Sequence, residues 1–145
     1  ENLIKNLHEL GYSIRLSCIM LKGYIDSIEE VKNLVEKAKE WNAEQLTIRS
    51  VKVPEKSQDQ KVFNWTKQRV LSRGTLVDIA DFFDKNATRL MTLDHGGVVY
   101  DFRNQNLCLT DCLTMKPNSE DLRQLIFFPD GHLRYDWRYE GAVLM

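Results

Sequence analysis

The sequences IRLSCIML at positions 14–21 and QLTIRSV at positions 45–51 decide the fold, together with the stretch between them. Both are short, rich in apolar and β-branched residues and bounded by turn-forming residues, so each predicts a β-strand. A helical pattern over residues 27–41 connects the two strands. A strand, a helix and a second strand most simply form a right-handed β-α-β unit, in which the two strands are parallel.

A capping box marks the start of the connecting helix, because Ser27 is followed three residues later by Glu30. Asp26 is a rival cap one residue earlier. Apolar residues fall on one face of this helix, and charged residues fall mostly on the other. The apolar face holds Ile28, Val31, Leu34, Val35, Ala38 and Trp41. We therefore expect this helix to cover the apolar side of the strands.

The overall composition is that of an ordinary soluble globular protein, with 145 residues, 43% hydrophobic and 28% charged. A net charge of −1 gives no overall attraction to nucleic acid or to an anionic membrane. No apolar run approaches the ~20 residues that a membrane-spanning helix needs, and no signal peptide is visible. Three cysteines, an odd number, fit a reducing compartment better than a disulfide framework. The expected location is the cytoplasm, with neither a membrane nor a nucleic acid as partner.

The rest of the chain predicts further helices and an antiparallel region. Residues 1–10 carry an apolar stripe that ends at Gly11, so the sequence begins inside a helix, as we expect of a piece of a longer protein. Two later helices are expected at 61–72 and 75–86, the second capped by Thr75.

Alternating patterns after the helices predict an antiparallel meander. Strands are expected at 98–102 and 107–113 around a turn at 103–106, followed by a hairpin at 122–137 around Pro129-Asp-Gly131. The chain is therefore expected to divide near Pro54. Residues 1–54 form an α/β part, and residues 55–145 form an α+β region with two helices and the meander.

A set of short motifs adds a family resemblance: Arg15-Leu-Ser17, Lys22-Gly23, Asp26-Ser27, Leu46-Thr-Ile-Arg49 and Pro54. With these motifs, residues 1–54 resemble the last third of the barrel in radical S-adenosylmethionine enzymes, especially those like the molybdopterin-precursor synthases. The hairpin sequence at 125–135 is similar to one in the small accessory subdomain that often follows such barrels. The resemblance implies an α/β fold, namely a partial parallel barrel (β-α-β) followed by an α+β extension with antiparallel hairpins.

The resemblance also implies a function: the chain is the carboxy-terminal part of such an enzyme, inactive alone, and completes a pocket for S-adenosylmethionine and a small-molecule substrate. Ser17 and Arg49 match positions that contact the cofactor or the substrate in that family. Thr47 is expected beside them as a cofactor-binding residue, and Arg15 is expected to bind substrate. No residue of the chain is expected to be catalytic.

The family's cluster-binding loop, C-x3-C-x2-C, is missing from this sequence. Cys108 and Cys112 have the first spacing, but position 115 is Met115. The 4Fe-4S cluster is therefore expected upstream of Glu1, on the upstream part of the same polypeptide. No metal or cofactor is expected to be held by this chain alone.

Strand alternation gives an independent reason to consider the polar residues. It places Arg15 and Ser17 on one face of the first strand, and Thr47 and Arg49 on the matching face of the second. A guanidinium offers a planar, permanently charged fork for a carboxylate or phosphate, and hydroxyls donate or accept hydrogen bonds. The alternative is a solvated strand face whose arginines pair with surface acids.

The cysteines and histidines have simpler interpretations. On a strand, Cys108 and Cys112 lie on the same face but ~13 Å apart, too far to share one ion unless a turn or bulge intervenes, so buried thiols are expected. Cys18 faces the apolar side and is expected in the core. Asp94-His95 is expected to be a turn with an exposed histidine rather than a catalytic pair.

The segment His132–Gly141 interleaves cations with aromatics. Packing across a hairpin is the expected role, and stacking a base or binding an anion is the alternative. The rival to the enzyme interpretation of the whole chain is a self-contained, non-catalytic α+β binding or assembly module.

Overall fold

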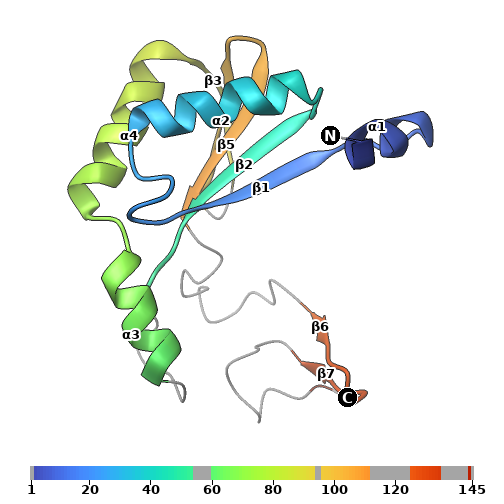
Figure 1. Ribbon diagram of the computed structural model, residues 1–145, viewed down its shortest axis with the longest axis vertical. Coiled ribbons are helices and arrows are strands. Elements are labelled where there is room, and N and C mark those ends of the chain that lie inside the picture. Colours follow the sequence, from blue (N-terminus) through green and yellow to red (C-terminus); the bar gives the residue numbers. More distant parts are fainter. Residues whose placement is uncertain (1, 54–59, 94–95, 112–124, 135–143, 145) are drawn as a thin grey trace. The chain divides into compact units, whose positions relative to one another are not determined.

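The computed structural model describes residues 2–53, 60–93, 96–111, 125–134 and 144 (Figure 1). The chain divides into two compact units, Glu1–Thr114 and Met115–Met145. In chain order the elements are α1 (Asn2–Glu9), β1 (Arg15–Met20), α2 (Ile28–Glu40), β2 (Gln45–Ser50), α3 (Gln60–Arg69), α4 (Arg73–Asn86), β3 (Thr88–Thr92), β4 (Val98–Phe102), β5 (Gln105–Asp111), β6 (Ile126–Phe127) and β7 (Leu133–Arg134).

One mixed sheet organises the first unit, with strand order β1-β2-β5-β4-β3. β1 and β2 are parallel with Ser17 opposite Thr47, which confirms the predicted β-α-β unit. β5 lies on the other side of β2 and is also parallel to it, whereas β4 and β3 are antiparallel to their neighbours. The predicted α/β class is therefore confirmed as a mixed sheet with four helices in the described ranges. Strands from both sides of Pro54 belong to this one sheet.

The core lies between one face of this sheet and the helices α2 and α4, which contact each other and the strands beneath them (Figure 1). Strand alternation turns the apolar residues of β1, β2, β4 and β5 to this side. The fully buried side chains include Val31, Val35, Leu46, Ile48, Ile79, Phe83, Tyr100 and Leu107. The expectation that a helix covers the apolar side of the strands is confirmed.

Ser27 is confirmed as the N-cap of α2, although the Glu30 carboxylate accepts the N–H of Asp26 and not that of Ser27. The Ser27 hydroxyl accepts the Glu30 N–H at 3.3 Å, and the Glu30 carboxylate accepts the Asp26 N–H at 2.7 Å. The predicted start of α4 is wrong: the helix begins at Arg73, because Ser72 is its N-cap and accepts the N–H of Thr75 at 3.0 Å. Thr75 therefore lies in the first helical turn instead of capping it.

The turn between β4 and β5 is shorter than the sequence predicted. Arg103 and Asn104 both have positive φ, 54° and 65°, which is the backbone of a two-residue hairpin turn. Gln105 and Asn106, expected in the turn, instead begin β5 and pair with Phe102 and Asp101. The carboxylate of Asp101 accepts the N–H of Asn104 at 2.9 Å and fixes the turn.

α1 is amphipathic, but none of its residues is buried, and Leu3 and Leu10 are 69% and 73% exposed. His8 of α1 contacts the residue before β2, with His8 Nε2 3.1 Å from Glu44 Oε1, and the other oxygen of Glu44 accepts the Ile14 N–H at 2.6 Å. That backbone hydrogen bond is the largest cause of the lowered pKa of Glu44, with the His8 contact adding to it. The apolar stripe is therefore only partly covered: Ile4 and Leu7 are half-buried, whereas Leu3 and Leu10 are exposed.

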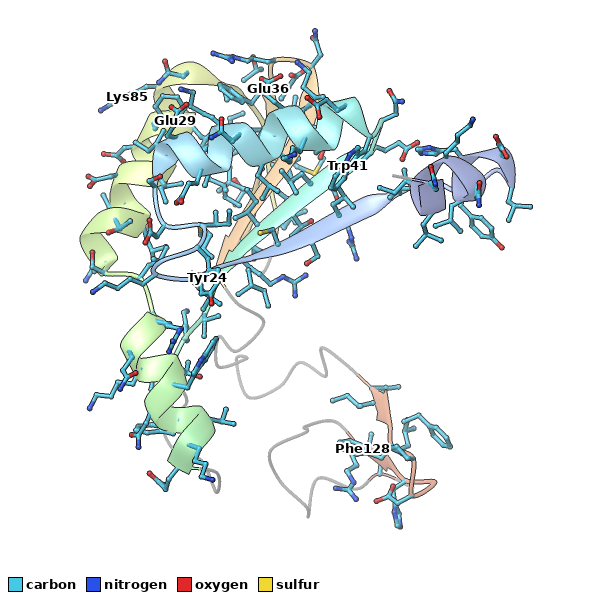
Figure 2. The ribbon with its side chains drawn as sticks, in the orientation of Figure 1. Tyr24, Glu29, Glu36, Trp41, Lys85 and Phe128 are labelled. Carbon is cyan, nitrogen blue, oxygen red and sulfur yellow. The ribbon has the colours of Figure 1, made fainter. Side chains whose placement is uncertain are left out.

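In the second unit, β6 and β7 form the predicted hairpin around Pro129-Asp-Gly131. Gly131 has φ +85°, a conformation that glycine adopts without strain. The guanidinium of Arg134 lies over the ring of Phe128, 4.4 Å from its centroid, and also pairs with Asp130. Figure 2 shows Phe128 beside this turn.

Tyr100 links β4 to α4, because its hydroxyl donates to the Asp84 carboxylate at 2.7 Å. Burial, followed by the hydrogen bond and charge of Asp84, raises the pKa of Tyr100 from 10.0 to about 12. The unfolded chain then loses this proton at lower pH than the folded chain, so the stabilisation is complete below pH 10 and is lost as pH rises toward 12. We expect the free energy of unfolding to decline over that range in urea titrations, and less steeply in Tyr100→Phe than in a Tyr24→Phe control.

Candidate functional site

The sheet face opposite α2 and α4 carries polar residues in three rows across β1, β2 and β5. We call this set the open face after its position on the side of the sheet opposite α2 and α4; within it, Thr47 and Cys108 are buried, with 6% and 5% of their surface exposed. By strand register it consists of Arg15, Gln45 and Asn106, then Ser17, Thr47 and Cys108, then Ile19, Arg49 and Thr110. The helices that pack on the sheet contact the other side of these strands, where the buried cluster of Leu46, Ile48 and Leu107 lies.

The structure brings the four predicted site residues, Arg15, Ser17, Thr47 and Arg49, onto this one face. Ser17 and Thr47 lie directly opposite each other on neighbouring strands, with Cys108 beyond Thr47. Arg49 lies one row nearer the carboxyl end of the strands. Arg15 lies at the amino end of β1, because it is the first residue of that strand.

Arg49 carries the strongest sign of an incomplete site. Its side chain is half-buried, and its Nε atom is buried without a hydrogen-bond partner among the described residues. Leaving a buried donor unsatisfied costs about 1–3 kcal/mol, and more when the group is charged. A bound anion that accepts from the guanidinium would remove that cost.

The electrostatics of the open face are positive. None of its nine residues is an acid, and two are arginines. Both arginines act on Cys108: burial raises the pKa of this thiol, and the charges of Arg15 and Arg49 work in the opposite direction. The two guanidinium groups, which start two rows apart, are therefore both close enough to influence the middle row.

Sequence reasoning missed two polar groups, one on the open face and one on the helix side of β2. Cys108 was expected only as a buried thiol, and it is buried, but it also lies in the middle row of the open face. Ser50, the last residue of β2, is 2% exposed, and its hydroxyl has no partner within the described ranges. The signal for Ser50 was present, since it is a polar residue at an apolar position of an alternating strand.

Other residues that the sequence analysis considered lie outside the open face or outside the described residues. Cys18 is a free, half-buried thiol on the helix side, packed against the core, and burial raises its pKa. Cys112, Asp94, His95 and the segment from Tyr135 to Gly141 lie outside the described residues.

His132, at the other end of the chain, contacts the Asp130 carboxylate at 3.3 Å and is exposed. Among the residues that the structure places, no three His, Cys, Asp or Glu side chains are grouped as a metal site. Within the same residues, no helix combines the length and apolar character needed to cross a bilayer.

Comparisons with known protein families, with curated proteins and with solved structures found no match to this chain.

Proposed function

We propose that the chain is the carboxy-terminal part of a radical S-adenosylmethionine enzyme, and that its open face forms one wall of the pocket for cofactor and substrate. The observation that carries the proposal is the buried, unpartnered Nε of Arg49 on a polar, acid-free sheet face. The motifs around Arg15-Leu-Ser17, Lys22-Gly23 and Leu46-Thr-Ile-Arg49 supply the family resemblance.

The residues of the open face fit S-adenosylmethionine chemically. Its carboxylate is a partner for the guanidinium of Arg49, which offers a planar fork of donors. The Ser17 and Thr47 hydroxyls, opposite each other on β1 and β2, donate or accept hydrogen bonds with the polar groups of the cofactor. Arg15 adds a second cation for an anionic group of the substrate, although it starts from the amino end of β1.

The architecture supports a sheet that continues into a partial barrel. β1 is an edge strand in the observed order, so one side of its backbone remains open for another strand. α1, which leads into β1, has no fully buried residue, and Leu3 on this helix is 69% exposed. In Figure 1, α1 lies beyond the amino-terminal end of β1, away from α2. An added parallel strand on the β1 edge would give this helix a surface on which to pack.

Together with an iron-sulfur cluster held by the enzyme, S-adenosylmethionine supplies radical chemistry. In this proposal the cluster is held by an upstream part of the same polypeptide, since the chain lacks the three-cysteine loop. The chain's own residues bind and orient: Arg49 holds a carboxylate, and Ser17 and Thr47 fix polar groups beside it. The free thiols of Cys18 and Cys108 fit a reducing compartment such as the cytoplasm.

The experiment uses the product of the whole gene that encodes this chain, reconstituted anaerobically with iron and sulfide. We expect a brown, iron-containing protein that binds S-adenosylmethionine in equilibrium dialysis. Arg49→Ala should weaken this binding by about 10- to 100-fold, because a hydrogen-bonded charge pair contributes roughly 1.5–3 kcal/mol. Arg49→Lys should recover only part of the loss, since an ammonium keeps the charge without the fork.

Arg73→Ala is the matched control, because Arg73 is an exposed arginine at the start of α4, on the helix side of the sheet. Urea titrations of each variant separate loss of binding from loss of folding. A colourless product that binds no S-adenosylmethionine would overturn the proposal and favour a non-catalytic binding or assembly module. If Arg49→Ala and Arg73→Ala bound S-adenosylmethionine with equal affinity, the open face would not be part of the cofactor site.

A further inference from the structure

A second polar site lies at the carboxyl end of β1. A shallow surface cavity of about 270 Å³, wide open to solvent, is lined by Lys22, Gly23, Gln68 and Arg69, which come from the β1–α2 loop and the last turn of α3. Arg69 is half-buried, and the other three residues are exposed. The N–H of Lys22 donates to the carbonyl of Arg69 at 2.8 Å and holds the two segments together. In α/β folds, ligands bind at this carboxyl edge of the parallel strands.

The chemistry of the lining favours an anion. Two of the four residues are cations, one is an amide, and none is an acid. The cation of Arg69 is held in place, because its guanidinium lies over the indole of Trp65, 4.5 Å from the ring centroid. Neither Lys22 nor Arg69 pairs with a carboxylate of the residues that the structure places.

The local backbone keeps the cavity accessible. Gly23 has φ +82°, and no atom lies within 4 Å of the position where a Cβ would stand, so the wall is open there. The acid of this loop, Asp26, is already engaged, because its carboxylate accepts the N–H of Gly23 at 2.6 Å. Tyr24 projects from the same loop and is 61% exposed (Figure 2).

The charged residues of α3 also favour an anion. Its ten residues include the cations Lys61, Lys67 and Arg69 and no acid. This local excess contrasts with the net charge of −1 for the whole chain. Lys67 and Arg69 lie in the last turn of α3, where their charges offset the negative end of the helix dipole, so the charged side chains of this turn are cations.

We infer that this cavity binds the anionic group, a phosphate or a carboxylate, of a small-molecule ligand. The ammonium of Lys22 and the guanidinium of Arg69 are the charged donors, and the Gln68 amide is the neutral one. The site is separate from the open face, since it is built from the β1–α2 loop and α3 and not from strand residues. It therefore stands whether or not the open face binds S-adenosylmethionine.

The test titrates the full 145-residue chain with inorganic phosphate, pyrophosphate, acetate and citrate at constant ionic strength, with chloride as the reference anion. Binding is followed by NMR through the backbone amides of Lys22 and Gly23 and the side-chain amide of Gln68. We expect saturable shifts at these groups with either the phosphate or the carboxylate series, and the stronger series identifies the anion class. Lys22→Gln and Arg69→Gln should each weaken binding by at least about tenfold.

The control variants are Lys37→Gln and Arg73→Gln, which remove exposed cations from α2 and α4 and should leave the affinity unchanged. Lys22→Gln keeps the backbone hydrogen bond to Arg69 and so tests the charge without disturbing the α3 contact. The inference is overturned by shifts that do not saturate, by shifts equal to those in chloride, or by losses of equal size in the control variants.

Discussion

Phe83→Ala is expected to lower the free energy of unfolding by ~3–5 kcal/mol, one of the two largest effects in this chain. Phe83 is fully buried on α4 and lies edge-on to Phe102 of β4, with ring centroids 5.0 Å apart. It also contacts the ring of Phe82 edge-on at 5.2 Å. Removing the ring therefore deletes buried apolar surface and leaves a cavity at the junction of α4 with the sheet.

Urea titrations followed by far-UV circular dichroism measure this effect. Val77→Ala is the control on the same helix, because Val77 is 46% exposed and its truncation should change stability by less than about 0.5 kcal/mol. A loss below ~1 kcal/mol for Phe83→Ala would contradict the packing of α4 against β4.

Ile48→Ala is expected to cost ~2–5 kcal/mol, whereas the same change at Ile19 should cost less than about 0.5 kcal/mol. Ile48 is fully buried on the helix side of β2, and Ile19 is 51% exposed on the open face of β1. The pair is matched in chemistry and in secondary structure, so the difference measures what covers each side of the sheet. The same titrations give both values.

The loss of unfolding free energy on Ile19→Ala can also be measured in the product of the whole gene. If an upstream part of the polypeptide covers the open face, Ile19→Ala should become more costly there than in the 145-residue chain. Equal costs of several kcal/mol at Ile19 and Ile48 in the short chain would show that the open face is already packed.

Local patterns predicted the local structure well. The alternation in 14–21 and 45–51 gave the two strands and their faces, and the Ser27 capping box gave the start of α2. The errors came from competing local chemistry: Ser72 replaced Thr75 as a cap, and the turn before β5 closed after two residues instead of four. Such choices differ by about 1 kcal/mol, which is too little to be read from residue types alone.

The pairing of strands that are far apart in the sequence could not be predicted from the sequence alone. Nothing in 45–51 or 107–113 indicates that β5 is the second neighbour of β2, because main-chain pairing carries no partner-specific signal. This pairing decides that Cys108 lies beside Thr47 on the open face. The cavity at Lys22 was hidden for the same reason, since it depends on one hydrogen bond to a residue of α3.

The position of β2 between β1 and β5 also determines how the chain can reach its folded state. During synthesis β1, α2 and β2 emerge together, but Asn106, which meets Gln45 across the β2–β5 pair, follows 61 residues later. Contacts that close such long loops slow folding, and an exposed strand awaiting its partner is open to misassembly. We expect the rate-limiting step of refolding to be the arrival of the β4–β5 hairpin at β2.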